Sequence, residues 1–119
     1  MNKVTVINRE IGQQPVLSFG NTTGDAAMAN YTLGKNPYKS LAFMLCCDDL
    51  DRENGNIDKA NNMYELCEEF HWIPVSMKND WTTIYADGVK YIGKQAAEPA
   101  AETPAEEQTE EAEELDNAA

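Results

Sequence analysis

Apolar positions in this chain form two patterns that alternate along the sequence. Spacings of three and four residues predict helices over residues 2–12, 26–31 and 57–70. Continuous apolar runs predict strands over residues 15–19, 41–47 and 72–77. The middle run is apolar throughout, as expected of a strand covered on both faces, and Pro74 favours an edge position for the last strand. The alternation predicts an α/β fold with a parallel, doubly wound sheet.

Residues 95–119 differ in composition from everything before them. They hold nine of the 21 acidic residues, no Lys or Arg, no aromatic residue and one large aliphatic side chain, Leu115. Such a segment cannot bury enough surface to offset its ordering entropy, so we expect a disordered, low-complexity acidic tail. We therefore divide the chain into one folded domain, residues 1–94, and this tail. An acidic docking segment is the alternative interpretation of the tail.

The net charge of −12 belongs mostly to the tail, because residues 1–94 hold 12 acids against 9 bases. This balance argues against nucleic acid and against an anionic membrane as partners, since both require clustered Lys and Arg. No apolar stretch approaches the roughly 20 residues of a membrane span. The N-terminus lacks the features of a signal peptide, so we expect a cytoplasmic protein unless an export signal lies upstream of Met1.

Cysteine and histidine offer little chemistry in this sequence. The three cysteines, Cys46, Cys47 and Cys67, are odd in number, and two of them are adjacent. We expect reduced, partly buried thiols rather than a disulfide framework. His71 is the single histidine and has no metal-ligand pattern around it, so a surface position at a helix end is expected.

A turn rich in glycine and polar residues follows the first predicted strand. Gly20, Asn21, Gly24 and Asp25 lie between this strand and the next predicted helix. Open α/β sheets place their active sites at the carboxyl ends of strands, and oxygen ligands suit a hard cation such as Mg²⁺. The alternative is an ordinary connection in which Asn and Asp cap the helix.

The spacing of this turn resembles the fourth motif of the haloacid dehalogenase-like hydrolases, in its phosphoserine phosphatase-like form. The residues in register are Gly20, Asn21, Gly24, Asp25 and Met28. Three longer segments are also similar to a bacterial branch of that family: Ile11–Asn21, Asp48–Glu53 and Trp72–Trp81. The resemblance covers roughly residues 3–90. It implies the C-terminal part of a Rossmannoid, three-layer parallel α/β domain.

The resemblance also implies roles for three residues. Lys3, which lies 17 residues before Gly20, matches the phosphate-binding lysine. Asn21 and Asp25 match the positions that hold or support Mg²⁺; an amide oxygen at the first would coordinate the ion without a formal charge. Thr23 departs from the branch by replacing a carboxylate. The implied activity is Mg²⁺-dependent hydrolysis of a small phosphorylated metabolite.

The family's nucleophile motif, D-x-D-G-T, has no match in the 119 residues. We therefore expect the chain alone to be catalytically incomplete, with its nucleophile upstream of Met1, and whether it is an enzyme by itself stays open. The acids of residues 48–53 are either a second metal or substrate contact or a solvated loop that pairs with Arg52. The alternative function is a non-catalytic binding or assembly protein, which pairs with a separate N-terminal half or with another subunit in a homo-oligomer.

Overall fold

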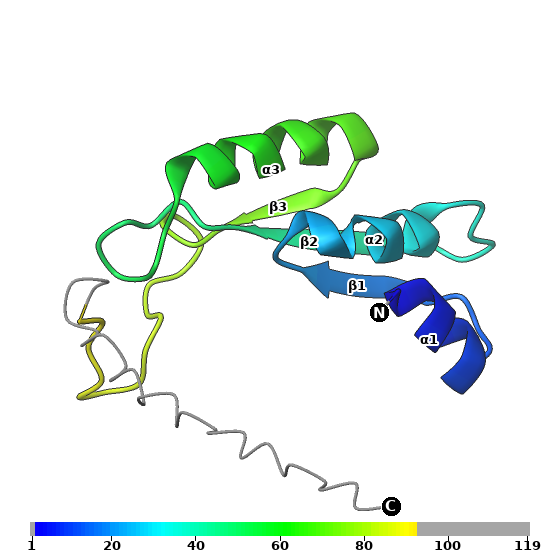
Figure 1. The fold of residues 1–119 in the computed structure, drawn as a ribbon, viewed down its shortest axis with the longest axis horizontal. Helices are drawn as coiled ribbons and strands as arrows, with labels where there is room; N and C mark the ends of the chain where they lie inside the picture. Colours follow the sequence, from blue (N-terminus) through cyan, green and yellow to red (C-terminus); the bar gives the residue numbers. More distant parts are fainter. Residues whose placement is uncertain (1, 93–119) are drawn as a thin grey trace, which may run out of the picture.

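The protein is an α/β domain whose three strands form one parallel sheet, flanked by helices (Figure 1). The computed structural model describes residues 2–92, so the predicted tail, residues 95–119, lies outside the described residues. The elements in chain order are α1 (Lys3–Glu10), β1 (Leu17–Gly20), the 3-10 turn η1 (Thr23–Asp25), α2 (Ala26–Leu33), β2 (Leu41–Cys46), α3 (Ile57–Phe70) and β3 (Ile73–Ser76). The predicted fold class is confirmed.

Short polar residues and left-handed positions set the helix ends. The side chains of Asn2 and Asn56 accept hydrogen bonds from the first turns of α1 and α3, both at 3.0 Å. Gly12, at φ 71°, follows α1 in the left-handed conformation that favours glycine. His71, at φ 61°, ends α3 and is exposed, as expected from the sequence.

The core lies between the sheet and the two helices α2 and α3. Its buried residues are Ala29, Ala42, Met44, Cys46, Ala60, Met63, Cys67 and Trp72. The indole N–H of Trp72 donates to the side-chain oxygen of Asn30 at 3.0 Å, which satisfies the polar atom of a ring that is only 3% exposed. All three cysteines are free, and two of them are fully buried, as predicted.

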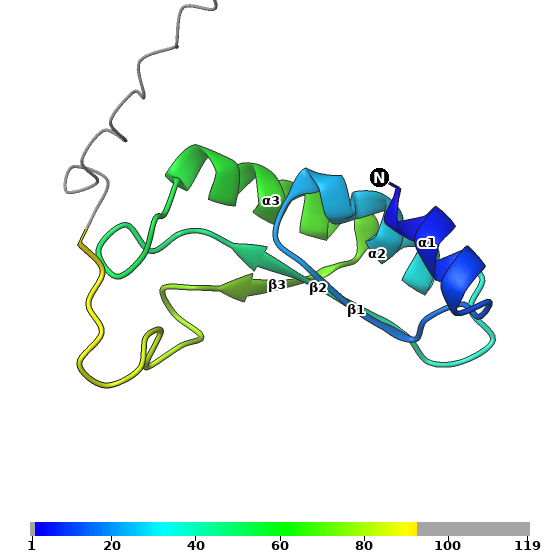
Figure 2. The same ribbon diagram turned by 60° about the horizontal axis from the view of Figure 1, so that its bottom comes forward.

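All three helices lie on one side of the sheet (Figure 2). The strands follow one another across the sheet in a single direction, and because β–α–β crossovers are right-handed, α2 and α3 must share a face. The opposite face carries Leu17, Phe19 and Phe43, and Phe19 is 60% exposed. Of the three layers implied by the resemblance, residues 2–92 hold two.

The expectation that the run 41–47 is covered on both faces is therefore wrong for the described residues. Alternate positions of β2 are buried under the helices, and those between them are only partly covered. A continuous apolar run shows that both faces of a strand favour an apolar neighbour. It does not say that the described part of the chain supplies both neighbours.

The segment after β3 contains no helix or strand up to residue 92. Residues 81–85 form bends, and Trp81 is exposed. Asp87 and Gly88 form a turn, with Gly88 at φ 81°. Within residues 2–92, no helix has both the length and the apolar content needed to cross a bilayer.

Candidate functional site

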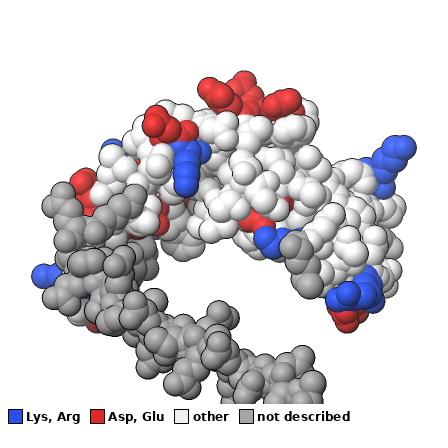
Figure 3. Space-filling model, viewed as in Figure 1, with Lys and Arg blue, Asp and Glu red and all other residues white. Residues whose placement is uncertain are grey.

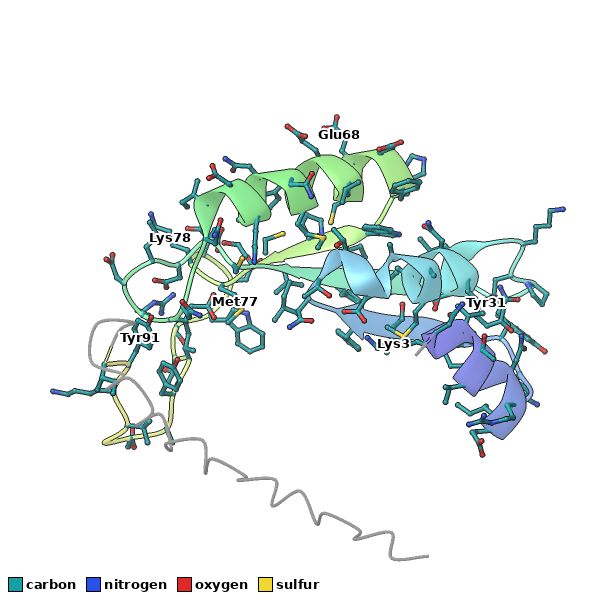
Figure 4. The ribbon with its side chains drawn as sticks, viewed as in Figure 1. Lys3, Tyr31, Glu68, Met77, Lys78 and Tyr91 are labelled. Carbon is teal, nitrogen blue, oxygen red and sulfur yellow. The ribbon has the colours of Figure 1, made fainter. Side chains whose placement is uncertain are left out.

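Lys3 and Asp25 meet at the carboxyl end of β1, although 22 residues separate them in the sequence. The Lys3 ammonium donates a hydrogen bond to Oδ1 of Asp25 and forms an ion pair with it. The Lys3 side chain is half exposed, whereas that of Asp25 is buried. Figure 4 shows Lys3 reaching from the start of α1 toward the turn after β1. The structure thus brings together two of the three residues that the sequence nominates.

The second oxygen of Asp25 closes the turn itself. Oδ2 accepts the backbone N–H of Asn21 at 3.0 Å and that of Thr22 at 3.4 Å. The Thr22 side chain accepts in return from the Asp25 backbone, which completes a capping box. The turn is therefore capped as the alternative interpretation expects, but by Thr22 and Asp25 and not by the side chain of Asn21. This capping does not conflict with a functional interpretation, because Lys3 occupies the other carboxylate oxygen.

The surroundings of Asp25 favour its charged form. Burial by itself raises the pKa of this carboxyl, but the hydrogen bonds from Lys3 and from two backbone N–H groups outweigh burial and lower the pKa below its ordinary value. The carboxylate therefore stays ionised at neutral pH and holds the Lys3 ammonium in place.

Gly20 is required for this arrangement. A Cβ at this position would lie 2.6 Å from Cβ of Asp25 and 2.8 Å from the sulfur of Met44. Any side chain at Gly20 would push Asp25 away from the strand, since Met44 is itself fully buried beneath it. The motif glycine thus permits the close approach of the carboxylate to the end of β1.

The described residues do not form a magnesium site by themselves. Both oxygens of Asp25 already accept hydrogen bonds, and Asn21 offers a single neutral oxygen. Within residues 2–92 there is no group of three or more His, Cys, Asp or Glu residues that would hold a metal. Because Mg²⁺ is usually bound through carboxylates, an ion at this turn would need ligands that residues 2–92 do not bring to it.

A polar cleft of 440 Å³ opens beside the turn. The residues that line it on the β1 side are Asn21, Thr22 and Thr23. Those on the side of β2 and α3 are Leu45, Cys47, Asn54, Asn56, Lys59, Asn62 and Met63. Lys59 is the only charged group among these described residues. The sequence analysis did not nominate the α3 side, although its polar positions follow from the amphipathic pattern of that helix.

Asp48 lies at the carboxyl end of β2 and connects three elements. Its Oδ2 accepts from the hydroxyls of Tyr64 at 2.8 Å and Ser76 at 2.6 Å, and its Oδ1 accepts the backbone N–H of Lys78 at 2.9 Å. Burial opposes these hydrogen bonds, but together they lower the pKa of Asp48. Asp48 therefore fixes the end of β3 against β2 and α3.

Asp49 and Arg52 form the centre of a second network. Oδ1 of Asp49 accepts the backbone N–H groups of Asp51 and Arg52, and Oδ2 accepts Nε of Arg52 at 2.5 Å. The backbone N–H of Arg52 is the main cause that lowers the pKa of Asp49, with burial opposing it. The other guanidinium nitrogens donate to four backbone carbonyls, those of Met77, Lys78, Trp81 and Thr82.

These two networks favour a structural role for the acidic segment 48–53. The carboxylate oxygens of Asp48 and Asp49 accept hydrogen bonds from other residues of the domain. Arg52 forms an ion pair with Asp49, as the loop interpretation expects. Arg52 also ties the segment after β3 to the β2–α3 loop across 25 to 30 residues. The hydrogen bonds of Asp48 and Asp49 thus favour the loop interpretation of this segment over a second metal contact.

The buried thiols are unsuited to nucleophilic chemistry. Burial, together with the neighbouring Cys67 and Asp48, raises the pKa of Cys46 to about 12. Burial also raises the pKa of Cys67. The thiolate is the nucleophilic form of cysteine, so these two side chains act as small apolar residues of the core.

Glu53 carries an unfavourably placed charge in the acidic segment. Its Oε1 is buried and has no hydrogen-bond partner. Burial raises the pKa of this carboxyl, and the charges of Asp49 and Asp48 raise it further. A carboxyl with a raised folded-state pKa costs stability above its unfolded pKa of about 4.5, and the cost grows as the pH rises through the folded value.

Glu53→Gln is therefore expected to raise the urea midpoint of unfolding at pH 7 and to leave it unchanged at pH 3.5. At the lower pH, the native Glu53 is already protonated and carries no penalty. Glu68→Gln, at an exposed position of α3, serves as the matched control and should change neither midpoint. A Glu53→Gln protein that is less stable than the native chain at pH 7 would contradict the assignment of Glu53 as an unfavourable charge.

Comparison with known proteins assigns no family to the chain. No model of a known protein family matches it, and no curated protein matches it. The fold and the geometry at its strand ends define a small α/β domain with a three-stranded parallel sheet.

Proposed function

We propose that residues 1–94 are the C-terminal part of a haloacid dehalogenase-like phosphomonoester hydrolase acting on a small phosphorylated metabolite, in which Lys3 binds the phosphoryl group. The observation that supports this most is the pairing of Lys3 with Asp25 at the carboxyl end of β1, beside Asn21. The family resemblance selects the same three residues, Lys3, Asn21 and Asp25, for phosphate and metal binding.

The geometry of Lys3 suits an anionic ligand. An ammonium group has three donors, and Asp25 takes one of them. The half-exposed side chain leaves the remaining donors accessible from the surface. Asp25 fixes the position of the cation without burying it, so a phosphoryl oxygen meets a preorganised positive charge.

The cleft beside the turn suits the rest of a small substrate. Its amides and hydroxyls offer donors and acceptors without a strong charge, and Lys59 adds a second cation at the α3 side. A phosphoryl group on Lys3 and a polar metabolite body in this cleft fit the chemistry of the lining residues. The cleft is thus the proposed substrate subsite.

The proposal places the nucleophile outside these 119 residues. Asp48 and Asp49 have both oxygens engaged in hydrogen bonds, and burial holds Cys46 protonated. The D-x-D-G-T motif and the carboxylates that a magnesium ion needs belong to another segment of polypeptide. Within this chain, Lys3 neutralises phosphoryl oxygens, and Asp25 positions Lys3.

Titration of the full 119-residue chain with inorganic phosphate tests the role of Lys3. We expect saturable binding, followed by NMR shifts of the backbone amides around Asn21. Lys3→Met should weaken the affinity about tenfold or more, because a charge-assisted hydrogen bond is worth about 1.5–3 kcal/mol.

Lys3→Arg keeps the charge and should retain most of the affinity. Lys39→Met removes an exposed lysine away from the turn and should have no effect. If Lys3→Met bound phosphate as tightly as the native chain does, or if the native chain did not bind phosphate, the proposed function would lose its support.

A further inference from the structure

The space around Lys3 and the polar cleft adjoin each other at Asn21. Lys3 and Asn21 are among the residues that line a hollow of 330 Å³, and the cleft of 440 Å³ begins at the same Asn21. Leu45 also lines both spaces, since the register that pairs Gly20 with Met44 places Leu45 beside Asn21. A ligand held at one end by Lys3 can therefore extend past Asn21 into the cleft.

The α3 side of the cleft is fixed to the end of β2. Asn56, Lys59 and Asn62 follow one another at intervals of three residues, so they lie along one side of the helix. The backbone N–H of Asn56 donates to the carbonyl of Cys47 at 2.8 Å, and the thiol of Cys47 donates to the carbonyl of Asn56 at 3.6 Å. This side of the cleft is thus in place before a ligand binds, which lowers the cost of binding.

Asn56 and Lys59 present hydrogen-bond donors to the cleft. Oδ1 of Asn56 accepts the backbone N–H of Lys59 at 3.0 Å, so the amino group of this amide is the end that remains for a ligand. The Lys59 ammonium forms no ion pair with a carboxylate of residues 2–92, whereas Lys3 and Arg52 each form one. An ammonium and an amino group suit a carboxylate, which accepts through both of its oxygens.

No acidic side chain is among the described residues that line the cleft. The acids of α3 lie elsewhere: Figure 3 shows acidic side chains gathered along the side of this helix away from the sheet, where Figure 4 places Glu68. An anionic ligand in the cleft is therefore attracted by Lys59 without a carboxylate beside it to oppose the attraction.

The other polar groups of the cleft suit a hydroxylated carbon chain. The hydroxyls of Thr22 and Thr23 and the amides of Asn54 and Asn62 both donate and accept hydrogen bonds, as the hydroxyls of a ligand do. The volume of 440 Å³ falls within the range of about 300–1,000 Å³ that is usual for small-molecule sites. The cleft thus has room for a body of several carbons and not only for a phosphate.

We propose that the substrate is a phosphorylated hydroxy acid, whose carboxylate is bound by Lys59 while Lys3 binds its phosphoryl group. This inference rests on the proposed function, since it assigns the other end of the same ligand. A single cation matches the single charge of a carboxylate. A second phosphate, with about two charges, would be only partly neutralised. Lys59 is thus a specificity-determining residue that takes no part in the chemical step.

Phosphogluconate and glucitol phosphate, each phosphorylated on its terminal hydroxyl, are matched probes. They differ only at the far end of the chain, where the first has a carboxylate and the second a hydroxymethyl group. Each is titrated into the full-length chain, and binding is followed by NMR shifts of the backbone amides of Asn21 and Lys59. We expect phosphogluconate to bind about tenfold more tightly, because a charge-assisted hydrogen bond is worth at least that factor.

Lys59→Met should remove this preference, so that both esters bind with the lower affinity of glucitol phosphate. Inorganic phosphate should bind this variant as it binds the native chain, since it contacts Lys3 alone. Lys59→Arg keeps the cation and should keep the preference, and Lys39→Met should change neither the preference nor the affinity for phosphate. The Lys59 side chain is exposed, so these variants should unfold at the urea midpoint of the native chain.

The outcomes for Lys59 and for Lys3 are separate. Equal affinities of the native chain for the two esters, or a preference that survives Lys59→Met, would overturn this inference and leave phosphate binding by Lys3 intact. If Lys3→Met left the affinity for inorganic phosphate unchanged while Lys59→Met abolished the preference, the proposed function would lose its support and the role of Lys59 would stand. A native chain that bound neither ester would overturn both.

Discussion

Replacing Gly55 with alanine is expected to lower the free energy of unfolding by about 3 kcal/mol, the upper end of the usual cost of overpacking. A Cβ at Gly55 would lie 2.2 Å from the carbonyl oxygen of Asp49 and 2.7 Å from its carbonyl carbon. These are backbone atoms of a loop that Arg52 fixes in place, so they cannot turn aside as a side chain would. The β2–α3 loop would have to open, and the hydrogen bonds of Asp49 would be lost with it.

Urea unfolding followed by tryptophan fluorescence measures this effect, because Trp72 is buried and its emission shifts when the core opens. Gly24→Ala is the matched control: its Cβ would meet nothing closer than 3.4 Å, and we expect a change of less than about 1 kcal/mol. Equal stabilities of the two variants would show that the loop is not rigid at Gly55.

Asp25→Ala is expected to cost about 1–3 kcal/mol of stability and to abolish the positioning of Lys3. The substitution leaves the N–H groups of Asn21 and Thr22 without their acceptor at the end of β1, and the Lys3 ammonium without its partner. Asp25→Asn keeps the side-chain shape and one acceptor oxygen, so it should retain part of the lost stability. Phosphate affinity should fall in both variants, since Lys3 is no longer fixed.

The pH dependence of the Asp25→Asn effect provides a sharper test. The folded-state pKa of Asp25 is lowered, so its charge stabilises the fold above the unfolded pKa of about 3.8, and this contribution is lost as the pH falls through the folded value. The stability difference between the native chain and Asp25→Asn should be constant near neutrality and shrink in acid. Asp87→Asn, in an exposed turn, should show no such difference. A difference that grows in acid would contradict the assignment.

The sequence predicts the helices and strands of this fold better than it predicts which of their faces are covered. The helix Ile57–Phe70 has the predicted bounds because a polar cap and a regular apolar stripe act locally. The sequence analysis missed the open face because every position of β2 is apolar, both those that point toward the helices and those that point away from them. Which set is buried depends on strand order and crossover direction, which are properties of the whole sheet.

The candidate site shows the same division. Lys3, Asn21 and Asp25 were nominated by spacing and resemblance, and the first and last of these meet at the end of β1. The α3 side of the cleft was not nominated, because Asn56 and Lys59 reach the same cleft as Thr22 only through the packing of α3 against β2 and β3. The four carbonyls that Arg52 binds were beyond prediction, since backbone acceptors leave no mark in a sequence.

The outer edge of β3 offers no free backbone donor to another strand. Pro74 has no N–H, and the N–H of Ser76 donates to Oδ2 of Asp80 at 2.7 Å. A strand laid along this edge would therefore find acceptors without donors and could not form a regular ladder. Edge strands are commonly protected in this way, so this side of the sheet resists uncontrolled pairing and aggregation.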